Sequence, residues 1–351
     1  MSNNRENIIV CDCEAEEVES FCNAISQKER PFSMKSHIAN WKRSGKISEI
    51  KRYSKYFGVA FKYFVSRRKY DVIIGWQQFY ALIFCFYSSL LHTKKRNTII
   101  ALNFTYKEKS GKLGGIYKWF MKKCLNPKYL DYIHVPSQNY ATITSELFDF
   151  PIENIIVSPF GINDPWEQFS KLNIPSNAPA DGYVLSIGRS NRDYDFLIEA
   201  WKNVDYPLVI ISDTYSSDNK GNSNVQIIRD IAGEYSYPWI ANCNAMIIPI
   251  DDGTICSGDT VLLTSLAMKK KVLITSPSTL SEMYIEHEKN GLCSEKDAKT
   301  FSNIVKDMIF SDKYDYIQNN ARESYLRKYS RKSMGEKIRE YILCNCCILR
   351  R

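Results

Sequence analysis

The stretch Tyr183-Val-Leu-Ser-Ile-Gly-Arg-Ser-Asn-Arg-Asp-Tyr-Asp-Phe-Leu-Ile-Glu-Ala-Trp201 contains the unit from which the fold is built. A short apolar run ends at Gly188, and helical spacing of apolar residues begins near Tyr194, which predicts a strand, a tight turn and a helix. Gly188 permits a close backbone approach in the turn. Arg189 and Arg192 follow, and guanidinium groups bind phosphate oxygens through charge-assisted, often bidentate hydrogen bonds. Taken alone, the stretch fits an ordinary turn with two solvated arginines equally well.

A second stretch supplies a helix start of the kind that binds anions. It reads Cys256-Ser-Gly-Asp-Thr260, Val-Leu-Leu-Thr-Ser-Leu-Ala-Met268 and Lys-Lys-Lys-Val-Leu-Ile-Thr275, which predicts a helix from near Thr260 and a following strand. The first N–H groups of such a helix and its positive dipole end favour an anion. Ser257 and Thr260 add hydroxyl donors, although Ser257 or Asp259 would serve equally well as an N-cap. Asp259 otherwise suits a sugar or ribose hydroxyl. Together the two stretches provide what is needed to hold a diphosphate.

The two motifs resemble the C-terminal domain of bacterial glycosyltransferases of the GT-B fold, especially the family-4-like group. In that group a Gly-Arg turn with a following basic residue binds the donor diphosphate, and a loop and helix of the type Ser-Gly-x-Thr-x-Leu-Leu-Glu-Ala-Met-Ala hold the nucleotide sugar. Gly188 and Arg189 match the turn, and Arg192 stands where many members have Lys. The positions that match the second motif are Ser257, Gly258, Thr260, Leu262, Leu263, Ala267 and Val272.

The resemblance implies an α/β protein with two Rossmann-like doubly wound domains that face each other across a cleft. Residues 1–165, with a returning C-terminal helix in 331–351, would form the acceptor-binding domain, and residues 166–330 the nucleotide-sugar donor-binding domain. The length of 351 residues fits two domains. The alternation of strand and helix patterns is typical of doubly wound sheets.

The resemblance also implies an activity, namely metal-independent hexosyl transfer with retention from a nucleotide diphosphate sugar, a UDP-sugar being favoured. The acceptor would be a glycan or lipid-linked sugar of cell-surface polysaccharide biosynthesis. No metal site and no cofactor beyond the nucleotide sugar are expected. Arg189 and Arg192 would be catalytic, stabilising the charge that develops on the leaving diphosphate. Asn103 and Thr105 are candidates for acceptor contacts across the cleft. The candidate donor-binding residues are Gly188, Ser257, Gly258, Asp259, Thr260 and Thr264.

One departure from the family pattern leaves a second interpretation open. The Glu-x7-Glu pair of the family would fall on Cys256 and Thr264, so neither carboxylate is present at its position. Thr264 replaces only part of the hydrogen bonding that a carboxylate gives to ribose, and Asp251, Asp252 or Asp259 are the candidates to replace the first Glu. The alternative is a non-catalytic GT-B partner subunit of an active glycosyltransferase.

The net charge of +8 is unevenly distributed along the chain. Residues 42–128 contain 20 Lys or Arg and 3 Asp or Glu, whereas residues 151–300 contain 12 and 20. In the basic part, residues 53–69 and 115–124 interleave aromatic and cationic side chains, a pattern that suits an anionic membrane surface. The same pattern fits a helix with a buried aromatic face and a solvated cationic face. It also fits a nucleic-acid-binding protein, but the chain has no recognised nucleic-acid motif, so nucleic acid is not an expected partner.

The most apolar stretch, residues 80–91, is shorter than the roughly 20 residues that span a bilayer. It predicts a buried helix after the strand at residues 71–74. No signal-peptide pattern precedes the strand predicted at residues 8–10. We therefore expect a cytoplasmic protein, bound peripherally to the cytoplasmic face of the membrane through its basic N-terminal domain. The 11 cysteines lack a His at zinc-site spacing, which predicts free thiols rather than a metal site.

Overall fold

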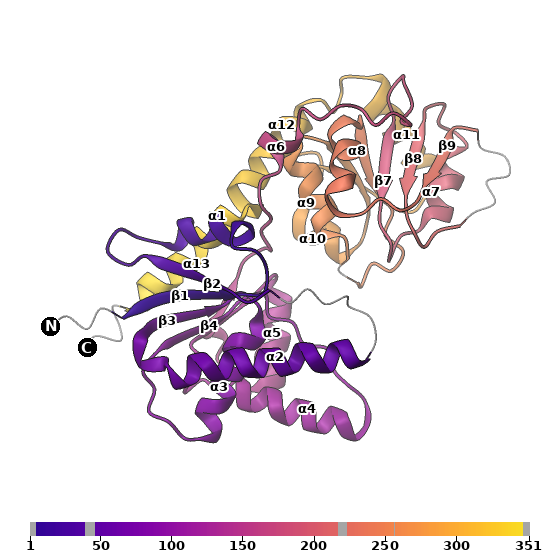
Figure 1. The fold of residues 1–351 in the computed structure, drawn as a ribbon. Helices are drawn as coiled ribbons and strands as arrows, with labels where there is room; N and C mark the ends of the chain where they lie inside the picture. The colour runs from indigo at the N-terminus through magenta and orange to yellow at the C-terminus, as the bar shows by residue number, and fades with distance from the viewer. Residues whose placement is uncertain (1–4, 39–45, 217–222, 256, 347–351) are drawn as a thin grey trace. The chain divides into compact units, whose positions relative to one another are not determined.

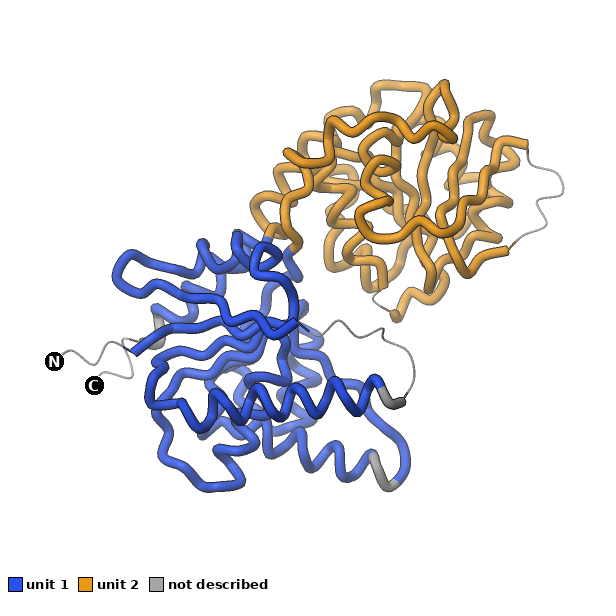
Figure 2. The backbone as a smooth tube through the Cα atoms, in the orientation of Figure 1, with its two compact units in different colours: residues 1–161, 331–351 blue, residues 162–330 orange. Residues whose placement is uncertain are grey.

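The computed structural model of the chain describes residues 5–38, 46–216, 223–255 and 257–346. The chain divides into two compact units (Figure 2). Unit 1 consists of residues 1–161 and 331–351, and unit 2 consists of residues 162–330. The acceptor and donor roles of the two units stay predictions.

Unit 1 is built on a six-stranded parallel sheet in the order β2-β1-β3-β4-β5-β6. Its strands read as almost continuous apolar runs, such as Ile8, Ile9 and Val10, all of them buried, because a parallel sheet with helices on both faces has no solvated side. The strands are β1 (Glu6–Cys11), β2 (Phe32–Ser36), β3 (Tyr70–Gly75), β4 (Thr98–Ala101), β5 (Tyr132–Val135) and β6 (Ile155–Val157).

Two layers of helices cover the unit 1 sheet (Figure 1). One face packs against α1 (Glu16–Ile25) and the returning helix α13 (Arg331–Cys346). These two helices approach closely at Gly335, where an added β-carbon would lie 2.8 Å from the carbonyl oxygen of Phe21. The opposite face packs against α2 to α5. The bounds are α2 (Lys46–Val65), η1 (Arg67–Lys69), α3 (Gln78–Leu90), α4 (Gly111–Cys124), α5 (Gln138–Phe148) and η2 (Ile152–Asn154).

Unit 2 contains a second six-stranded parallel sheet, in the order β12-β11-β10-β7-β8-β9. Its strands are β7 (Val184–Ile187), β8 (Leu208–Ile211), β9 (Val225–Ile228), β10 (Ala245–Ile248), β11 (Lys271–Thr275) and β12 (Leu292–Ser294). Helices α7 and α11 pack on one face, and α8 and α9 lie on the other side (Figure 1). The remaining bounds are α6 (Trp166–Phe169), α7 (Tyr194–Trp201), η3 (Gly233–Ser236), α8 (Tyr237–Asn242), α9 (Asp259–Ala267), α10 (Thr279–Tyr284), α11 (Ala298–Phe310), α12 (Tyr316–Ser324) and the π-helical segment η4 (Tyr325–Tyr329). The predicted pair of Rossmann-like doubly wound domains is confirmed.

Strand order shows where each sheet is suited to bind a ligand. In unit 2 the chain crosses from one half of the sheet to the other between β7 and β10, and in unit 1 between β1 and β3. Open α/β sheets bind ligands outside the carboxyl ends of the strands at such a switch point. The first candidate positions are therefore the loops after β7 and β10 and those after β1 and β3.

The predicted buried helix of residues 80–91 corresponds to α3, in which most side chains are inaccessible to solvent. Over the described ranges, no helix is long and apolar enough to span a membrane.

Candidate functional site

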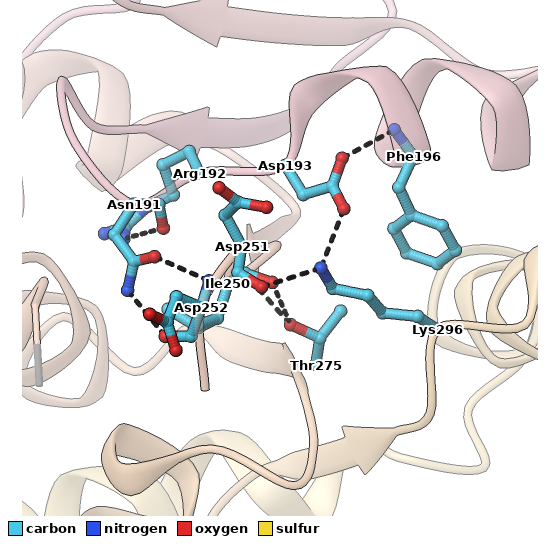
Figure 3. Close-up of polar contacts among 9 residues, drawn as sticks. All are labelled: Asn191, Arg192, Asp193, Phe196, Ile250, Asp251, Asp252, Thr275 and Lys296. Carbon is cyan, nitrogen blue, oxygen red and sulfur yellow. Dashed lines mark hydrogen bonds and ion pairs between the residues drawn. The ribbon is translucent and has the colours of Figure 1, made fainter. Parts of the chain in front are cut away.

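The turn after β7 carries the first predicted motif. Gly188 follows the strand, and its N–H donates to the carbonyl oxygen of Ile211 at 3.2 Å. A β-carbon at Gly188 would lie 2.7 Å from Nε of Arg192, so a larger residue at this position would displace the arginine side chain. Asp193 then caps α7 by accepting a hydrogen bond from the N–H of Phe196 at 3.0 Å. The other carboxylate oxygen of Asp193 pairs with Nζ of Lys296 at 2.7 Å (Figure 3).

Asn191 joins this turn to the loop after β10. Its Nδ2 donates to the carbonyl oxygen of Asp252 at 3.0 Å, and its Oδ1 accepts from the N–H of Asp252 at 2.7 Å (Figure 3). The same Nδ2 also donates to the carbonyl oxygen of Ile255 at 3.2 Å. The N–H of Asp193 donates to the carbonyl oxygen of Pro249 at 2.9 Å. The two loops that flank the switch point are therefore bonded to each other side by side.

The second motif forms the amino end of α9. This helix begins at Asp259, in agreement with the predicted start near Thr260, and its N-cap is Gly258 with φ 109° and no side-chain hydrogen bond. Neither Ser257 nor Asp259 therefore occupies the N-cap position. Glycine adopts this positive φ without strain. The amino end, which has no side-chain cap, leaves backbone N–H groups of the first turn available to a ligand.

Arg192 lies between the two motifs and binds backbone oxygens of both. Its Nη1 donates to the carbonyl oxygens of Asn191 at 3.1 Å, Ser257 at 3.3 Å and Ser190 at 3.4 Å, and its Nε donates to that of Ile187 at 3.4 Å. Burial lowers the pKa of Arg192 from its ordinary value, and the nearby Tyr194 and Asp259 oppose that shift. The guanidinium stays charged, since arginine does not lose its proton in proteins.

Arg189 differs from Arg192 in being accessible. Its side chain is 69% exposed and lies 3.9 Å from the carboxylate of Asp213, an ion pair at the limit of contact. Thr214 Oγ1 donates to the carbonyl oxygen of Arg189 at 2.6 Å, which holds the backbone of the turn. Arg189 thus presents an exposed cation to the cavity that the amino end of α9 also lines.

These groups line a cavity of about 530 Å³, a size typical of small-molecule sites. The predicted residues on its wall are Gly188, Arg189, Arg192, Ser257, Gly258, Thr260 and Thr264. Asp259 is not part of the lining, and neither are Asp251 and Asp252. The carboxylate of Asp252 instead accepts hydrogen bonds from Oγ1 and N–H of Thr254, which lower its pKa. Cys256 lies outside the described residues.

The sequence motifs do not include the rest of the wall. Ile211, Ser212 and Asp213 follow β8, and Ile231 to Glu234 follow β9, with Ser236, Tyr237 and Ile240 from η3 and α8. These segments surround the cavity because β8 and β9 lie beside β7 in the sheet. The sequence places each of these segments directly after a predicted strand. Only the strand order shows that these strands lie next to β7 and that the segments therefore reach the cavity.

Asn103 and Thr105 belong to unit 1, in the loop after β4. Asn103 has φ 52°, and its N–H donates to Nδ1 of His134 at 3.3 Å. Within the described structure its Oδ1 is buried and has no hydrogen-bond partner. Thr105 binds Gln78, whose Oε1 accepts from the N–H of Thr105 and whose Nε2 donates to its Oγ1, both at 3.1 Å. The acceptor role of Asn103 and Thr105 stays a prediction.

Comparison with known proteins gives matches among solved structures. No protein-family model and no curated protein matches the chain. A glycosyltransferase from Rickettsia africae aligns with a TM-score of 0.63 at 15% identity, covering 97% of this chain and 100% of the other. Sucrose-phosphate synthase from Thermosynechococcus elongatus aligns with a TM-score of 0.65 at 16% identity, covering 99% and 100%. Anabaena HepE, solved in complex with UDP, aligns with a TM-score of 0.59 at 12% identity, covering 97% and 100%.

At these identities the likeness is evidence about the fold. The alignments extend over nearly the whole of each chain and include both units. The chain therefore has the GT-B fold, as the two motifs around Arg189 and Gly258 predict.

Proposed function

We propose that the protein is a glycosyltransferase that transfers a sugar from a nucleotide diphosphate sugar bound in the cavity of unit 2. The observation that carries the proposal is the meeting of Arg189 with the uncapped amino end of α9 on one cavity wall. A guanidinium and a helix start are both suited to phosphate oxygens. The cavity lies at the switch point of the sheet, where open α/β sheets bind ligands.

In this proposal the diphosphate lies between Arg189 and the N–H groups at Gly258 to Thr260, with the Ser257 hydroxyl beside them. These groups stabilise the negative charge that grows on the diphosphate as the sugar leaves. Arg192 binds four carbonyl oxygens with Nε and Nη1, and in the described region Nη2 makes no hydrogen bond. Its Nη2 is therefore the part that can reach a phosphate. We propose a metal-independent reaction, because these cationic and dipolar groups supply the positive charge.

The rest of the cavity wall suits a nucleoside. Ile211, Ile231 and Ile240 provide apolar surface, and Tyr237 provides a ring against which a base can stack. Asp213 and Glu234 also line the cavity and provide carboxylates for ribose hydroxyls. They are our candidates for the hydrogen bonding that the absent Glu pair gives in the family. A UDP-sugar is our preferred donor, since HepE of the same fold binds UDP, and transfer with retention follows from the sequence resemblance.

We propose that the acceptor is a glycan or lipid-linked sugar of a cell-surface polysaccharide, reached at the cytoplasmic face of a membrane. The support is a surface formed by α2 and α4 on one face of unit 1 (Figure 1). Its exposed apolar residues include Phe61, Val65, Ile116 and Trp119. The rings of α2 and α4 meet through α3, as Phe61 packs on Tyr87 at 5.4 Å and Trp119 on Phe86 at 6.1 Å between ring centroids.

The helices that form this apolar surface, which we call the α2/α4 surface, also carry cations. Lys62, Lys118, Lys122 and Lys123 lie on the same two helices, in the segment where 20 Lys or Arg accompany 3 Asp or Glu. Each cation close to an anionic membrane contributes about 1 kcal/mol. Apolar side chains within a basic surface suit an anionic bilayer, into which the rings insert while the lysines face lipid phosphates.

The donor site is tested by thermal stabilisation of the purified chain with UDP-, GDP-, CMP- and dTDP-sugars. A shift with one nucleotide class that is lost in Arg189→Ala and kept in Arg229→Ala supports the proposal and names the donor class. Arg229 is a suitable control because its side chain binds the carbonyl oxygen of Tyr215, and it is absent from the cavity wall. The absence of any shift, with co-purification of an active glycosyltransferase, would favour the non-catalytic partner subunit.

A further inference from the structure

The turn after β7 contains a residue in an uncommon backbone conformation. Asn191 has φ 55°, in the left-handed region that residues other than glycine seldom adopt. Asparagine tolerates this region better than most residues, because its short side chain can hydrogen-bond to nearby backbone groups. Ser190 and Arg192, on either side of it, line the cavity, whereas Asn191 is absent from the part of the wall that the described residues form. Its side chain is bonded instead to the loop after β10 (Figure 3).

The amide of Asn191 holds a short segment of that loop at both ends. It bonds to the N–H and the carbonyl oxygen of Asp252, and to the carbonyl oxygen of Ile255. The segment from Asp252 to Ile255 leads to the amino end of α9. Because one planar amide makes all three bonds, it fixes the segment before the helix to the turn after β7.

A second connection comes from the loop after β12. Lys296 Nζ pairs with the carboxylate of Asp193 at 2.7 Å and donates to the carbonyl oxygen of Asp251 at 3.0 Å (Figure 3). In the sheet, β11 and β10 lie between β12 and β7, so Lys296 connects loops that are not neighbours. The Asp193 side chain is only 23% exposed, and a partly buried ion pair is screened less by salt than a surface pair. Asn191, Asp193 and Lys296, which we call the latch, thus join the loops after β7, β10 and β12.

The latch acts on one part of the cavity wall. It holds the turn that carries Arg189 and the segment before α9, and these are the two halves of the proposed phosphate site. The part of the wall that suits a nucleoside comes from the loops after β8 and β9. Over the described ranges, no hydrogen bond or ion pair joins those two loops to Asn191, Asp193 or Lys296. A left-handed residue other than glycine persists where its surroundings hold it, and such residues cluster at functional sites.

We propose that Asn191 is a positioning residue for the donor diphosphate, and that the ion pair of Asp193 with Lys296 supports it. The latch sets the spacing between Arg189 and the amino end of α9, so that the diphosphate can bind to both at once. This inference rests on the proposed function, since it concerns the same site. It predicts that loosening the latch weakens the binding of phosphate groups and leaves the binding of the nucleoside unchanged.

The test compares inorganic pyrophosphate, UDP and uridine on the full chain, by calorimetric titration for the first two and by ligand-observed NMR titration for uridine. Asn191→Gly keeps the left-handed backbone accessible and removes the amide. We expect it to weaken the binding of UDP and pyrophosphate about tenfold, the equivalent of one charge-assisted hydrogen bond, and to leave uridine binding unchanged. Asn203→Gly is the matched control, because Asn203 is exposed in the turn after α7, and it should bind all three ligands as the wild type does.

Lys296→Met tests the second connection, and it carries the test if Asn191→Gly does not fold. The substitution removes the ion pair but keeps an unbranched side chain. We expect a loss of about threefold in UDP affinity, with uridine affinity unchanged. Lys296→Arg, which keeps the charge, should bind UDP as the wild type does. Lys299→Met, at an exposed lysine of α11, is the matched control.

The proposal is overturned if the folded latch variants bind UDP as tightly as their controls do. It is also overturned if uridine binding falls by the same factor as UDP binding, which would give the latch a structural role only. Either result leaves the donor site standing. Pyrophosphate binding that depends on Asn191, in a protein that binds no UDP, would refute the UDP-sugar donor and support the latch. A wild type that binds neither pyrophosphate nor UDP would overturn both proposals.

Discussion

A β-carbon placed on Gly258 would overlap Nη2 of Arg192, so the guanidinium of the opposite loop packs directly against the helix start at Gly258. Glycine leaves room for this guanidinium and adopts the φ of 109° without strain. The backbone that we expect to bind the diphosphate is thus positioned by a side chain from the other side of the switch point.

Gly258→Ala should therefore destabilise unit 2 by about 2 kcal/mol, through backbone strain and displacement of Arg192, and should abolish nucleotide binding. The measurements are urea unfolding and calorimetric titration with UDP. Gly115→Ala is the control, because Gly115 lies in α4 with open space around it. It should leave binding unchanged and raise helix stability by a few tenths to about 1 kcal/mol. Normal UDP affinity in Gly258→Ala would contradict the helix-start site.

Arg189→Ala should weaken UDP binding by about 10- to 100-fold, because a charge-assisted hydrogen bond contributes about 1.5–3 kcal/mol. Its unfolding free energy should stay almost unchanged, since the exposed pair with Asp213 at 3.9 Å contributes little. Calorimetric titration and urea unfolding measure the two effects separately. A variant that unfolds more easily but binds UDP normally would give Arg189 a structural role only.

Arg192→Lys, unlike Arg189→Ala, should lower the unfolding free energy clearly. An ammonium cannot reproduce the bonds that Nε and Nη1 make to carbonyl oxygens of both loops. We expect a loss of about 1–3 kcal/mol in unfolding free energy, together with weaker UDP binding. Urea unfolding and calorimetric titration with UDP measure these two effects. Unchanged stability would show that the guanidinium does not hold the loops together.

Acidification should destabilise unit 1 through His134. Burial lowers the pKa of His134 to about 4, below its unfolded value of about 6.5. The unfolded chain then binds more protons than the folded one between these values, so the stabilisation is present above pH 6.5 and is lost as pH falls toward 4. The expected loss between pH 7 and pH 5 is about 2 kcal/mol.

Urea unfolding at the two pH values, for the wild type and for His134→Gln, measures this contribution. The variant should lose less stability on acidification than the wild type does. Equal losses in both proteins would assign the pH dependence to other groups.

Replacing Phe61 and Trp119 by Ser should reduce binding to phosphatidylglycerol-containing vesicles by about tenfold or more, because both rings are half exposed on the α2/α4 surface. Vesicle sedimentation measures the effect. Ile174→Ser, at an apolar side chain of unit 2 that is 57% exposed, is the control and should bind as the wild type does. Binding that is equal in all three proteins would remove the support for the membrane proposal.

Local patterns were sufficient to predict the fold class and part of the cavity wall. The apolar runs before Gly188 and after Met268 mark buried parallel strands, and Gly-Arg and Ser-Gly-x-Thr mark the two loops of the switch point. The start of α9 was predicted near Thr260 and lies at Asp259, but the N-cap was not predicted, because Gly258 occupies it with φ 109° and no capping side chain indicates it.

Other parts of the site depend on long-range packing. Asp213, Glu234 and Tyr237 line the cavity because β8 and β9 lie beside β7, which spacing along the chain does not reveal. The position of Lys270, directly before β11, also has a tertiary explanation. Lys270 Nζ donates to the carbonyl oxygens of Ala241 at 2.6 Å and Cys243 at 3.0 Å, at the carboxyl end of α8, where a cation is favoured.

The central claim is that the cavity between Arg189 and the amino end of α9 binds the donor diphosphate. A crystal structure of the protein soaked with UDP tests it most directly. The claim predicts phosphate oxygens within hydrogen-bond distance of Arg189 and of the backbone N–H groups of Gly258 to Thr260, with the uracil beside Tyr237. UDP bound elsewhere, or an empty cavity at saturating UDP, would contradict it.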